Sequence, residues 1–426
     1  MEKGQNSVGD SCCNPRMDFG HTLSTDAIRR YSRQLLVPSF GVAGQERLLK
    51  SSALVVGCGG LGSPIALYLA AAGVGCLGLM DHDVVELSNL HRQVIHTEAS
   101  VGKAKVKSAA SACLGLNSSL QVLEYPHRLD AANAVEIVSK FDVVLDATDN
   151  LPTRYLLNDA CVVTGKPLVS GAALGVEGQV TTYNHKNGPC YRCLFPIPPP
   201  EGARQRCSDN GVIGVVPGII GTFQALEAVK IAGGVGETLN GRMLILDAWS
   251  TRMHMVKLRG RNVACVACGD SPQISKSNLH QYDYERFTQS PLSDEAPEGQ
   301  HIIPESERIS NAELKTRLES GHAHVLLDVR DAHEYAISRL PNSLNIPFSS
   351  LKENLQTLEA AVSDSRQSPS SISPSGSPDI YVVCRRGNDS QRAVQLLRNE
   401  GFPTAVDVIG GLESWVKTVN EDFPFY

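Results

Sequence analysis

Residues 53–81 read ALVVGCGGLGSPIALYLAAAGVGCLGLMD. The apolar start is typical of a buried strand, and the glycine-rich turn at 57–62 precedes an apolar helix over 64–73. A second apolar strand over 77–81 ends on Asp81, about 20 residues beyond the turn. An acidic side chain at this position binds ribose hydroxyls in nucleotide-binding βαβ units. The stretch therefore predicts the phosphate-binding half of an α/β nucleotide fold.

Residues 51–80 carry no charged side chain, a pattern that also fits a membrane span. Seven glycines and Pro64 interrupt this run, so a buried strand–turn–helix–strand is the better prediction. The N-terminal sequence MEKGQNSVGDSCC has no apolar segment of the signal-peptide kind. We therefore expect a protein of the cytosol that has no membrane partner.

The composition is typical of a globular protein with more than one domain. The chain has 426 residues, of which 42% are hydrophobic and 20% charged, and its formal net charge is −6. This length accommodates two or three domains of ordinary size. The absence of a strongly basic balance argues against a dedicated nucleic-acid binder, so no direct nucleic-acid partner is expected.

Strands and helices continue to alternate after the second strand. Further strands are predicted at 120–125 and 142–148, with helices between them, and this order favours a doubly wound parallel sheet. Residues 23–269 are predicted to form this Rossmann-like α/β domain, with capped helices over 23–50. A polar tail at 1–22 is predicted to be disordered.

A second, smaller α/β domain is predicted over 302–426. Residues 270–301, before it, are polar and without periodicity, and we interpret them as a linker. Residues 363–378 hold eight Ser and three Pro, too few apolar groups to offset the entropy of ordering, which predicts a disordered insertion. The expected strands and helices of this domain are, in order, 325–329, 349–361, 380–384, 389–400 and 405–411.

The glycine turn alone does not identify the nucleotide, because it suits a nicotinamide-dependent oxidoreductase or a plain tight turn as well. The residues that follow favour a triphosphate. Polar and cationic groups come after the second strand, in SNLHRQ at 88–93 and GKAK at 102–105. DATDN at 146–150 ends another strand, at the sheet edge where ligands bind in open α/β sheets. A carboxylate there could hold Mg²⁺ beside phosphates.

The set GCGGLG, DHDVVELSNLHRQ, GKAK and DATDN resembles the adenylylating domain of ubiquitin-activating enzymes, and is most similar to the bacterial molybdopterin-synthase and thiamine-biosynthesis adenylyltransferases. The resemblance covers 23–269 and implies ATP, Mg²⁺ and a role in catalysis for Asp149. It also implies a homodimer in which Arg33, within RYSRQ, reaches the phosphates of the other subunit's ATP. The implied ATP contacts are Gly60, Asp81, Ser88, Asn89, Leu90, His91, Arg92, Lys105, Asp149 and Asn150.

Two CxxC pairs occur in the first domain, formed by Cys190 with Cys193 and by Cys265 with Cys268. Four thiolates in paired spacing suit tetrahedral Zn²⁺, and a site with no open ligand position is structural. Disulfides are disfavoured in the cytosol, and the duplication argues against a redox CxxC. We expect one structural Zn²⁺ per chain, as in the adenylyltransferases that the domain resembles.

Cys207 lies in the Pro- and Gly-bearing stretch PIPPPEGARQRCSDNG, which is typical of a surface loop. Arg204 and Arg206 favour its thiolate, the reactive form, although an incidental exposed thiol is the alternative. The resemblance places the thioester-forming cysteine of the activating enzymes at this point. Cys207 is therefore expected to be catalytic.

Cys384 begins CRRGNDS between a predicted strand and a predicted helix. Converging backbone N–H groups and the helix dipole are expected to lower the pKa of such a cysteine, and the same turn suits a phosphatase. LLDVRDAHEY at 326–335, RLPNSLNIP at 339–347 and VIGGLESW at 408–415 resemble the rhodanese fold instead. The resemblance implies that Cys384 carries a persulfide; a docking domain without catalysis is the alternative.

An adenylyltransferase followed by a rhodanese resembles the bifunctional adenylyltransferase–sulfurtransferase family of molybdenum cofactor synthesis. The resemblance implies that ATP activates the C-terminal glycine of a ubiquitin-like sulfur carrier ending in Gly-Gly, and that Cys384 then delivers sulfur to give a thiocarboxylate. Cys207 either forms an acyl thioester or resolves an acyl disulfide. The implied acceptors are the molybdopterin synthase small subunit and the ubiquitin-related modifier of tRNA wobble-uridine thiolation. A cysteine desulfurase is the implied sulfur donor.

Overall fold

The computed structural model describes residues 20–200, 211–292, 301–320, 323–366 and 379–426. The chain forms two compact units, Met1–Asp294 and Glu295–Tyr426. Both have the α/β fold that the sequence predicts.

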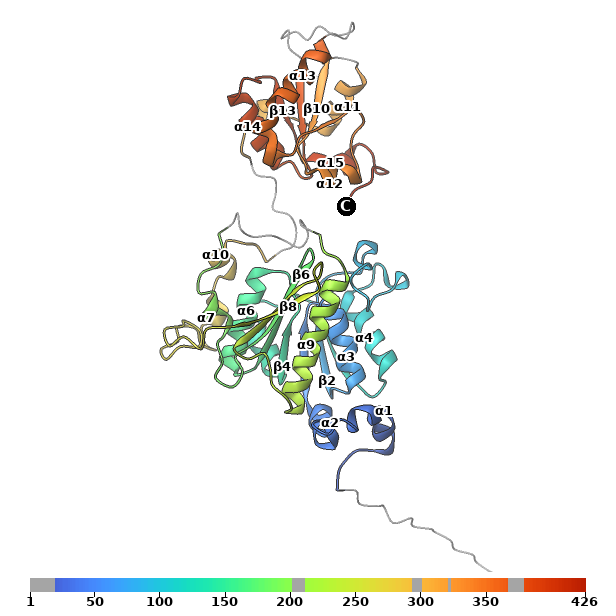
Figure 1. Ribbon diagram of the computed structural model, residues 1–426, viewed down its shortest axis with the longest axis vertical. Coiled ribbons are helices and arrows are strands. Elements are labelled where there is room, and N and C mark those ends of the chain that lie inside the picture. The colour runs from blue at the N-terminus through green and yellow to red at the C-terminus, as the bar shows by residue number, and fades with distance from the viewer. Residues whose placement is uncertain (1–19, 201–210, 293–300, 321–322, 367–378) are drawn as a thin grey trace, which may run out of the picture. The chain divides into compact units, whose positions relative to one another are not determined.

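The first unit is built on one mixed sheet, with strand order β3-β2-β1-β4-β5-β6-β7-β8 (Figure 1). The strands from β3 to β5 are parallel, which confirms the predicted doubly wound parallel sheet for this part of the unit. The strands from β6 to β8 pair antiparallel and extend the sheet on one side, which the sequence did not predict. The strands are β1 Ser52–Val56, β2 Cys76–Met80, β3 Gln121–Tyr125, β4 Val143–Asp146, β5 Leu168–Leu174, β6 Glu177–Tyr183, β7 Arg242–Asp247 and β8 Arg252–Lys257.

Helices cover both faces of this sheet, and each face has its own apolar core. One core contains residues of α3, α4 and α9, and the other contains residues of α5, α6 and the CxxC segments. Figure 1 shows α1 and α2 together at one end of the unit. The helices are α1 Thr25–Leu35, α2 Gly41–Lys50, α3 Gly62–Ala72, α4 Lys105–Leu116, α5 Ala134–Ser139, α6 Leu151–Thr164, α7 Tyr191–Leu194, α9 Val215–Gly233 and α10 Tyr284–Thr288.

Helix α9 has the length and apolar composition of a membrane span, the only such helix among the described residues. Its polar side chains are bound within the unit. Gln224 donates to the main-chain oxygens of Asp146 and Val169, and the buried Glu227 accepts hydrogen bonds from Thr182 Oγ1 and the Leu239 N–H. These bonds tie α9 to the sheet, so we interpret it as a core helix.

Residues 270–292 are folded, which corrects their assignment to a linker. Leu279 is fully buried, and Tyr284 of α10 donates from Oη to Asp159 of α6 across 2.9 Å. The polar composition was misleading because the burial of this segment depends on partners more than 100 residues away in sequence. The described part of the first unit thus extends to Leu292, beyond the predicted boundary at 269.

The second unit is a parallel sheet in the order β11-β10-β12-β13-β9, with helices on both faces. Helix α13 continues to Arg366, so the first residues of the predicted insertion are helical, and the rest of it lies outside the described residues. The strands are β9 Arg308–Ile309, β10 His324–Asp328, β11 Leu344–Asn345, β12 Asp379–Val383 and β13 Ala405–Val408. The helices are α11 Asn311–Glu319, α12 Ala332–Ile337, α13 Leu355–Arg366, α14 Asp389–Asn399 and α15 Gly411–Thr418.

Candidate functional site

The turn between β1 and α3 requires glycine at two positions, because a Cβ atom at either would collide with main-chain atoms. Gly57 has φ +98°, and a Cβ there would lie 2.6 Å from the carbonyl oxygen of Ala147. A Cβ on Gly62 would overlap the carbonyl oxygen of Gly57. The turn therefore packs tightly against the end of β4 while α3 begins at Gly62. N–H groups at such a helix start suit a phosphate.

Asp81, at the end of β2, is fixed against this turn. Its two carboxylate oxygens accept hydrogen bonds from the N–H groups of Cys58, at 2.7 Å, and Asp83, at 2.9 Å. Lys105, only 7% exposed at the start of α4, donates to Asp83 across 2.7 Å. Burial opposes the charge of Lys105, but Asp81, Asp83 and Asp149 together raise its pKa, so the ammonium stays protonated. The site therefore combines the carboxylates of Asp81 and Asp83 with the buried ammonium group of Lys105.

The segment after β2 lies beside the turn. Asn89 is buried and accepts from the Glu86 N–H, and Arg92 donates to the carbonyl oxygen of Ser88 across 3.2 Å. A Cβ on Gly60 would lie 3.5 Å from Cγ of Arg92, so the aliphatic part of this side chain lies beside the glycine turn. Burial and the charge of Arg92 lower the pKa of His91, so this ring is neutral at pH 7.

Leu90 is half-buried in the same segment, and Ser88 is exposed. His96 was not predicted as a site residue. Its Nε2 lies 3.0 Å from the carbonyl oxygen of Cys58, and its Nδ1 lies 2.9 Å from Oγ of Ser108. This buried histidine ties the glycine turn to α4, and a lone His in a loop gave no signal of that role.

At the end of β4, two carboxylates have different surroundings. Asp146 is fully buried and is bound by Arg154 Nε at 2.9 Å and Ser170 Oγ at 2.8 Å. Asp149 is exposed and interacts electrostatically with Lys105. Because Asp146 is held by structural partners, Asp149 is the better candidate for a cation ligand.

Asn150 has a role that the sequence did not indicate. Its Oδ1 accepts from the Thr153 N–H and caps α6, while its Nδ2 lies 3.3 Å from the carbonyl oxygens of Pro291 and Leu292. The chain therefore leaves the first unit at the same sheet edge as the candidate nucleotide site.

The structure does not bring Arg33 to the glycine turn of its own chain. Arg33 is exposed on α1, and the neighbouring Tyr31 packs against Gly73 at the far end of α3. The glycine turn lies at the other end of α3, and an 11-residue helix is about 16 Å long, so Arg33 is remote from the turn. Leu36, three residues after this arginine, is 72% exposed.

The four CxxC sulfurs converge. Sγ of Cys190 lies 3.7 Å from that of Cys193 and 3.6 Å from that of Cys265, and Cys193 lies 3.3 Å from Cys268. All four lie within 4.8 Å of one another, and the three separations above are near the edge length, about 3.8 Å, of a tetrahedron with Zn–S bonds of about 2.3 Å. Hydrogen bonding with Cys190 lowers the pKa of Cys193 to about 6. The donor set therefore fits Zn²⁺.

Arg192, between the cysteines of the first pair, was missed by sequence reasoning. It is 1% exposed and makes a bidentate pair with the buried Asp159, at 2.7 and 2.8 Å. Its guanidinium also lies 4.5 Å from the ring centroid of Phe287 and 5.0 Å from that of Tyr282. The arginine between two metal-ligand cysteines was the available sequence signal. Its contacts with Asp159 and Phe287 join the cysteine cluster to α6 and α10.

In the second unit, Cys384 directly follows β12 and lies before α14 in a turn of polar groups. The Gly387 N–H donates to its Sγ across 3.1 Å, and Oγ of Ser390 lies 3.2 Å away. Burial nevertheless raises the pKa of Cys384, since it outweighs the hydrogen bonds from Ser390 and Gly387. The expectation of a lowered pKa is therefore wrong for the resting thiol. Cys207, the other predicted reactive thiol, lies outside the described residues.

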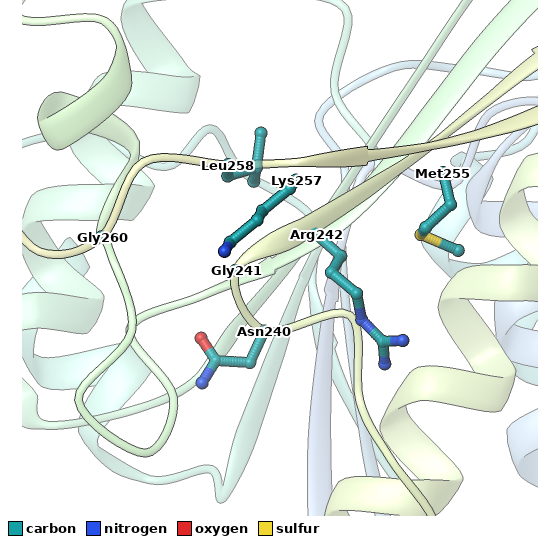
Figure 2. Close-up of a pocket in the computed structure, with 7 residues that line it drawn as sticks. All are labelled: Asn240, Gly241, Arg242, Met255, Lys257, Leu258 and Gly260. Atoms are coloured by element: carbon teal, nitrogen blue, oxygen red, sulfur yellow. The ribbon is translucent and has the colours of Figure 1, made fainter.

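A surface hollow lies elsewhere, where β7 begins and β8 ends (Figure 2). Because β7 runs parallel to β4, this is the edge opposite Asp149. The hollow is therefore not part of the candidate nucleotide site. Its lining residues are Asn240, Gly241, Arg242, Met255, Lys257, Leu258 and Gly260.

Comparisons with known proteins agree with this division. The ThiF family matches residues 31–267, and the rhodanese-like domain matches residues 310–418. Among solved structures, Escherichia coli MccB with ATP has a TM-score of 0.51 and 25% identity, covering 56% of this chain and 73% of that one. MccB with MccA-N7isoASN gives the same TM-score and identity. The protein is thus an ATP-binding ThiF-type enzyme joined to a rhodanese-like unit.

Full-length relatives are more specific. The chain is 57% identical to adenylyltransferase and sulfurtransferase MOCS3 of Arabidopsis thaliana, covering 99% of this chain and 90% of that protein. It is 48% identical to the Mus musculus protein of the same name, covering 95% and 88%. The chain belongs to the MOCS3 family of adenylyltransferases and sulfurtransferases.

Proposed function

We propose that the protein adenylylates the C-terminal glycine of a ubiquitin-like sulfur carrier ending in Gly-Gly and then converts it to a thiocarboxylate. One observation carries this proposal. The same chain has a glycine turn at 57–62 beside Asp81 and Lys105, and a separate loop at 384–390 that surrounds the sulfur of Cys384. A carboxylate is a poor electrophile, so sulfur transfer to it requires prior activation.

In the first step, the glycine turn and Arg92 bind phosphates, and Asp81 binds the ribose. The carrier carboxylate attacks the α-phosphorus of ATP, pyrophosphate leaves and an acyl-adenylate forms. Asp149 would hold Mg²⁺, which supplies charge neutralisation at the phosphates when bound. The buried, protonated ammonium of Lys105 holds Asp83 by a hydrogen bond and interacts electrostatically with Asp149.

In the second step, the outer sulfur of a Cys384 persulfide attacks the acyl carbon and AMP leaves. The product is an acyl disulfide between carrier and Cys384. Attack of the Cys207 thiolate on Sγ of Cys384 would release the thiocarboxylate and leave a Cys207–Cys384 disulfide, which a cellular thiol reduces. Alternatively, Cys207 first displaces AMP and holds the acyl group as a thioester. A cysteine desulfurase would recharge Cys384 with sulfur.

Other features support the assembly we propose. We propose that Cys190, Cys193, Cys265 and Cys268 hold one structural Zn²⁺, which the convergence of their four sulfurs supports. We also propose a homodimer in which Arg33 serves the partner's ATP. Arg33 is exposed and remote from the glycine turn of its own chain, and Leu36, three residues later, is an exposed apolar side chain. We place the protein in the cytosol, where it serves molybdenum cofactor synthesis and tRNA wobble-uridine thiolation.

Mass spectrometry of a Gly-Gly-ended carrier incubated with enzyme, MgATP and a persulfide donor tests the proposal. We expect the carrier to gain 16 mass units as one carboxylate oxygen is replaced by sulfur, roughly the difference between the two atoms. Omission of ATP should prevent the gain. Sulfur incorporation without ATP, or NAD(H) binding without ATP–pyrophosphate exchange, would contradict the proposal.

A further inference from the structure

The carboxylate of Asp407 lies on the same face of the second sheet as Cys384. Asp407 of β13 is paired with Val382 of β12, and Cys384 follows Val382 by two residues, so the three side chains point to one side of the sheet. Val382 and Cys384 pack in the core that contains the apolar residues of α14. Asp407 is fully buried there, and an ionised carboxylate in such a place needs polar partners.

The two oxygens of this carboxylate differ in their partners. Oδ2 accepts from Nε of Arg308 across 2.9 Å, and the Arg308 side chain is only 5% exposed. Oδ1 is buried and makes no hydrogen bond of ordinary geometry to any other residue that the structure describes. Burial raises the pKa of Asp407, while the hydroxyl of Ser390 and the charge of Arg308 oppose the rise. The Ser390 hydroxyl is therefore the neighbouring group that can satisfy Oδ1.

The same hydroxyl faces the sulfur of Cys384. Ser390 is fully buried on α14, and its Oγ lies 3.2 Å from Sγ of Cys384. A serine hydroxyl carries one proton to donate. Because the sulfur and Oδ1 of Asp407 both accept, a hydrogen bond from Ser390 to one of them leaves the other without this donor.

The remaining groups around the sulfur are held by the main chain or by the loop. Burial and the charge of Asp389 raise the pKa of Cys384, while the hydroxyl and N–H of Ser390 and the N–H of Gly387 oppose the rise. The fully buried Gln391 donates from Nε2 to the carbonyl oxygen of Gly387 across 2.6 Å and so fixes this part of the loop. The direction of the Ser390 hydroxyl is thus the adjustable part of this environment.

We propose that Asp407 is a positioning residue that draws the hydroxyl proton of Ser390 away from Cys384 and so restrains the reactivity of the sulfur. Asp407 acts on the sulfur through Ser390. When Cys384 loses its proton to take up sulfur from a persulfide, the hydroxyl turns from the carboxylate to the thiolate. The inference rests on the proposed function only in taking Cys384 as the residue that carries sulfur.

Alkylation of Cys384 by iodoacetamide, followed on the full-length chain by peptide mass spectrometry, tests this role. In Asp407→Asn we expect the rate at pH 8 to rise about threefold, the size of one modest hydrogen bond, because the hydroxyl is then free to donate to the thiolate. The pH profile of alkylation should move to lower pH. Asp379→Asn changes a carboxylate of the same sheet that is paired with Arg317, and this matched control should leave the rate unchanged.

A Ser390→Ala background separates the hydroxyl from a direct effect of charge. In the double variant Ser390→Ala/Asp407→Asn the rate should equal that of Ser390→Ala alone, because no hydroxyl is left to turn. An equal rise in both backgrounds, which a direct effect of the Asp407 charge on the sulfur would give, overturns the proposal. An unchanged or lower rate in Asp407→Asn overturns it as well.

A second variant covers loss of folding. If Asp407→Asn unfolds the unit because it leaves Arg308 buried without its charged partner, Asp407→Asn is combined with Arg308→Met, which removes both charges. The comparison is then repeated with and without Ser390, and only a rise that requires Ser390 supports the proposal. The readout needs neither ATP nor carrier, so failure of carrier thiocarboxylation would count against the proposed function and leave this inference standing.

Discussion

At the scale of single residues, burial decides which carboxylate is available for chemistry. Asp146 and Asp149 are close in sequence at the end of β4, yet Asp146 is fully buried and paired with Arg154, while Asp149 is exposed. Removal of Asp146 would leave Arg154 buried without its partner, a change of about 3–5 kcal/mol in the free energy of unfolding. A variant of Asp149 is therefore the cleaner test of chemistry.

Asp149→Ala is expected to lower ATP–pyrophosphate exchange about 100-fold, the size of effect seen when one stabilising group is removed from a reacting charge. The melting temperature should stay the same, because the side chain is exposed. Glu136→Ala, an exposed carboxylate on α5, serves as the control. Wild-type exchange in Asp149→Ala would exclude Asp149 as the magnesium ligand.

The raised pKa of Cys384 gives a prediction about pH. The folded state favours the protonated thiol, so its contribution to stability is present below the ordinary thiol pKa and is lost as pH rises through the folded value. Alkylation of Cys384 by iodoacetamide should accordingly keep increasing above about pH 8.5, the ordinary cysteine pKa.

Ser390→Ala should shift this profile to higher pH, because the hydrogen bond from Ser390 lowers the pKa of Cys384. The alkylation rate at pH 8 would fall about threefold, as expected for loss of one modest hydrogen bond. Ser363→Ala, on the exposed side of α13, is the matched control. A profile that moves to lower pH in Ser390→Ala would contradict the assigned direction.

At the scale of elements, the cysteine cluster brings together the CxxC segments at 190–193 and 265–268, which are distant in sequence. Arg192 lies between two of its cysteines and binds Asp159 on α6, which also accepts from Tyr284 on α10. Loss of the metal is therefore expected to loosen α10 as well as the loops that carry the cysteines, since structural zinc contributes folding free energy directly.

Cys190→Ala and Cys268→Ala should each lose zinc and lower the melting temperature of the first unit. Cys76→Ala, which removes a half-buried thiol outside the cluster, should retain about one zinc per chain by metal analysis. Hydrogen exchange in residues 279–292 should accelerate in the first two variants alone. Wild-type protein with less than about half a zinc per chain would contradict the four-cysteine site.

The elements differ in how far the sequence predicted them. The strands β1, β2 and β4 are nearly continuous apolar runs, so the pattern located them and the nucleotide edge at their ends. Strand β8 reads RMHMVK and is exposed along its whole length, so no buried pattern marked it. Residues 279–288 are ordered by Arg192 and Asp159, far away in sequence, and local composition could not reveal that contact.

At the scale of the whole molecule, two chemistries are joined in one chain, and each unit contributes one cysteine to the proposed reaction. Cys384 lies in a preformed turn that ends a core strand, and the sequence identified it because the strand, the cysteine and the helix are contiguous. Cys207 was identified from loop composition and family resemblance. Because the two thiols are proposed to act at different steps, their variants should stop the reaction at different points.

Cys384→Ala should still form acyl-adenylate, measured by pyrophosphate exchange, but should transfer no sulfur from its own persulfide. Cys207→Ala should adenylate the carrier and load persulfide on Cys384 normally. If Cys207 resolves the acyl disulfide, this second variant accumulates carrier joined to Cys384, visible on non-reducing gels and released by added thiol. If Cys207 instead forms an obligatory thioester, no joined species appears. Formation of thiocarboxylate by Cys207→Ala at the wild-type rate without reductant would exclude both roles, because neither mechanism then needs the thiol.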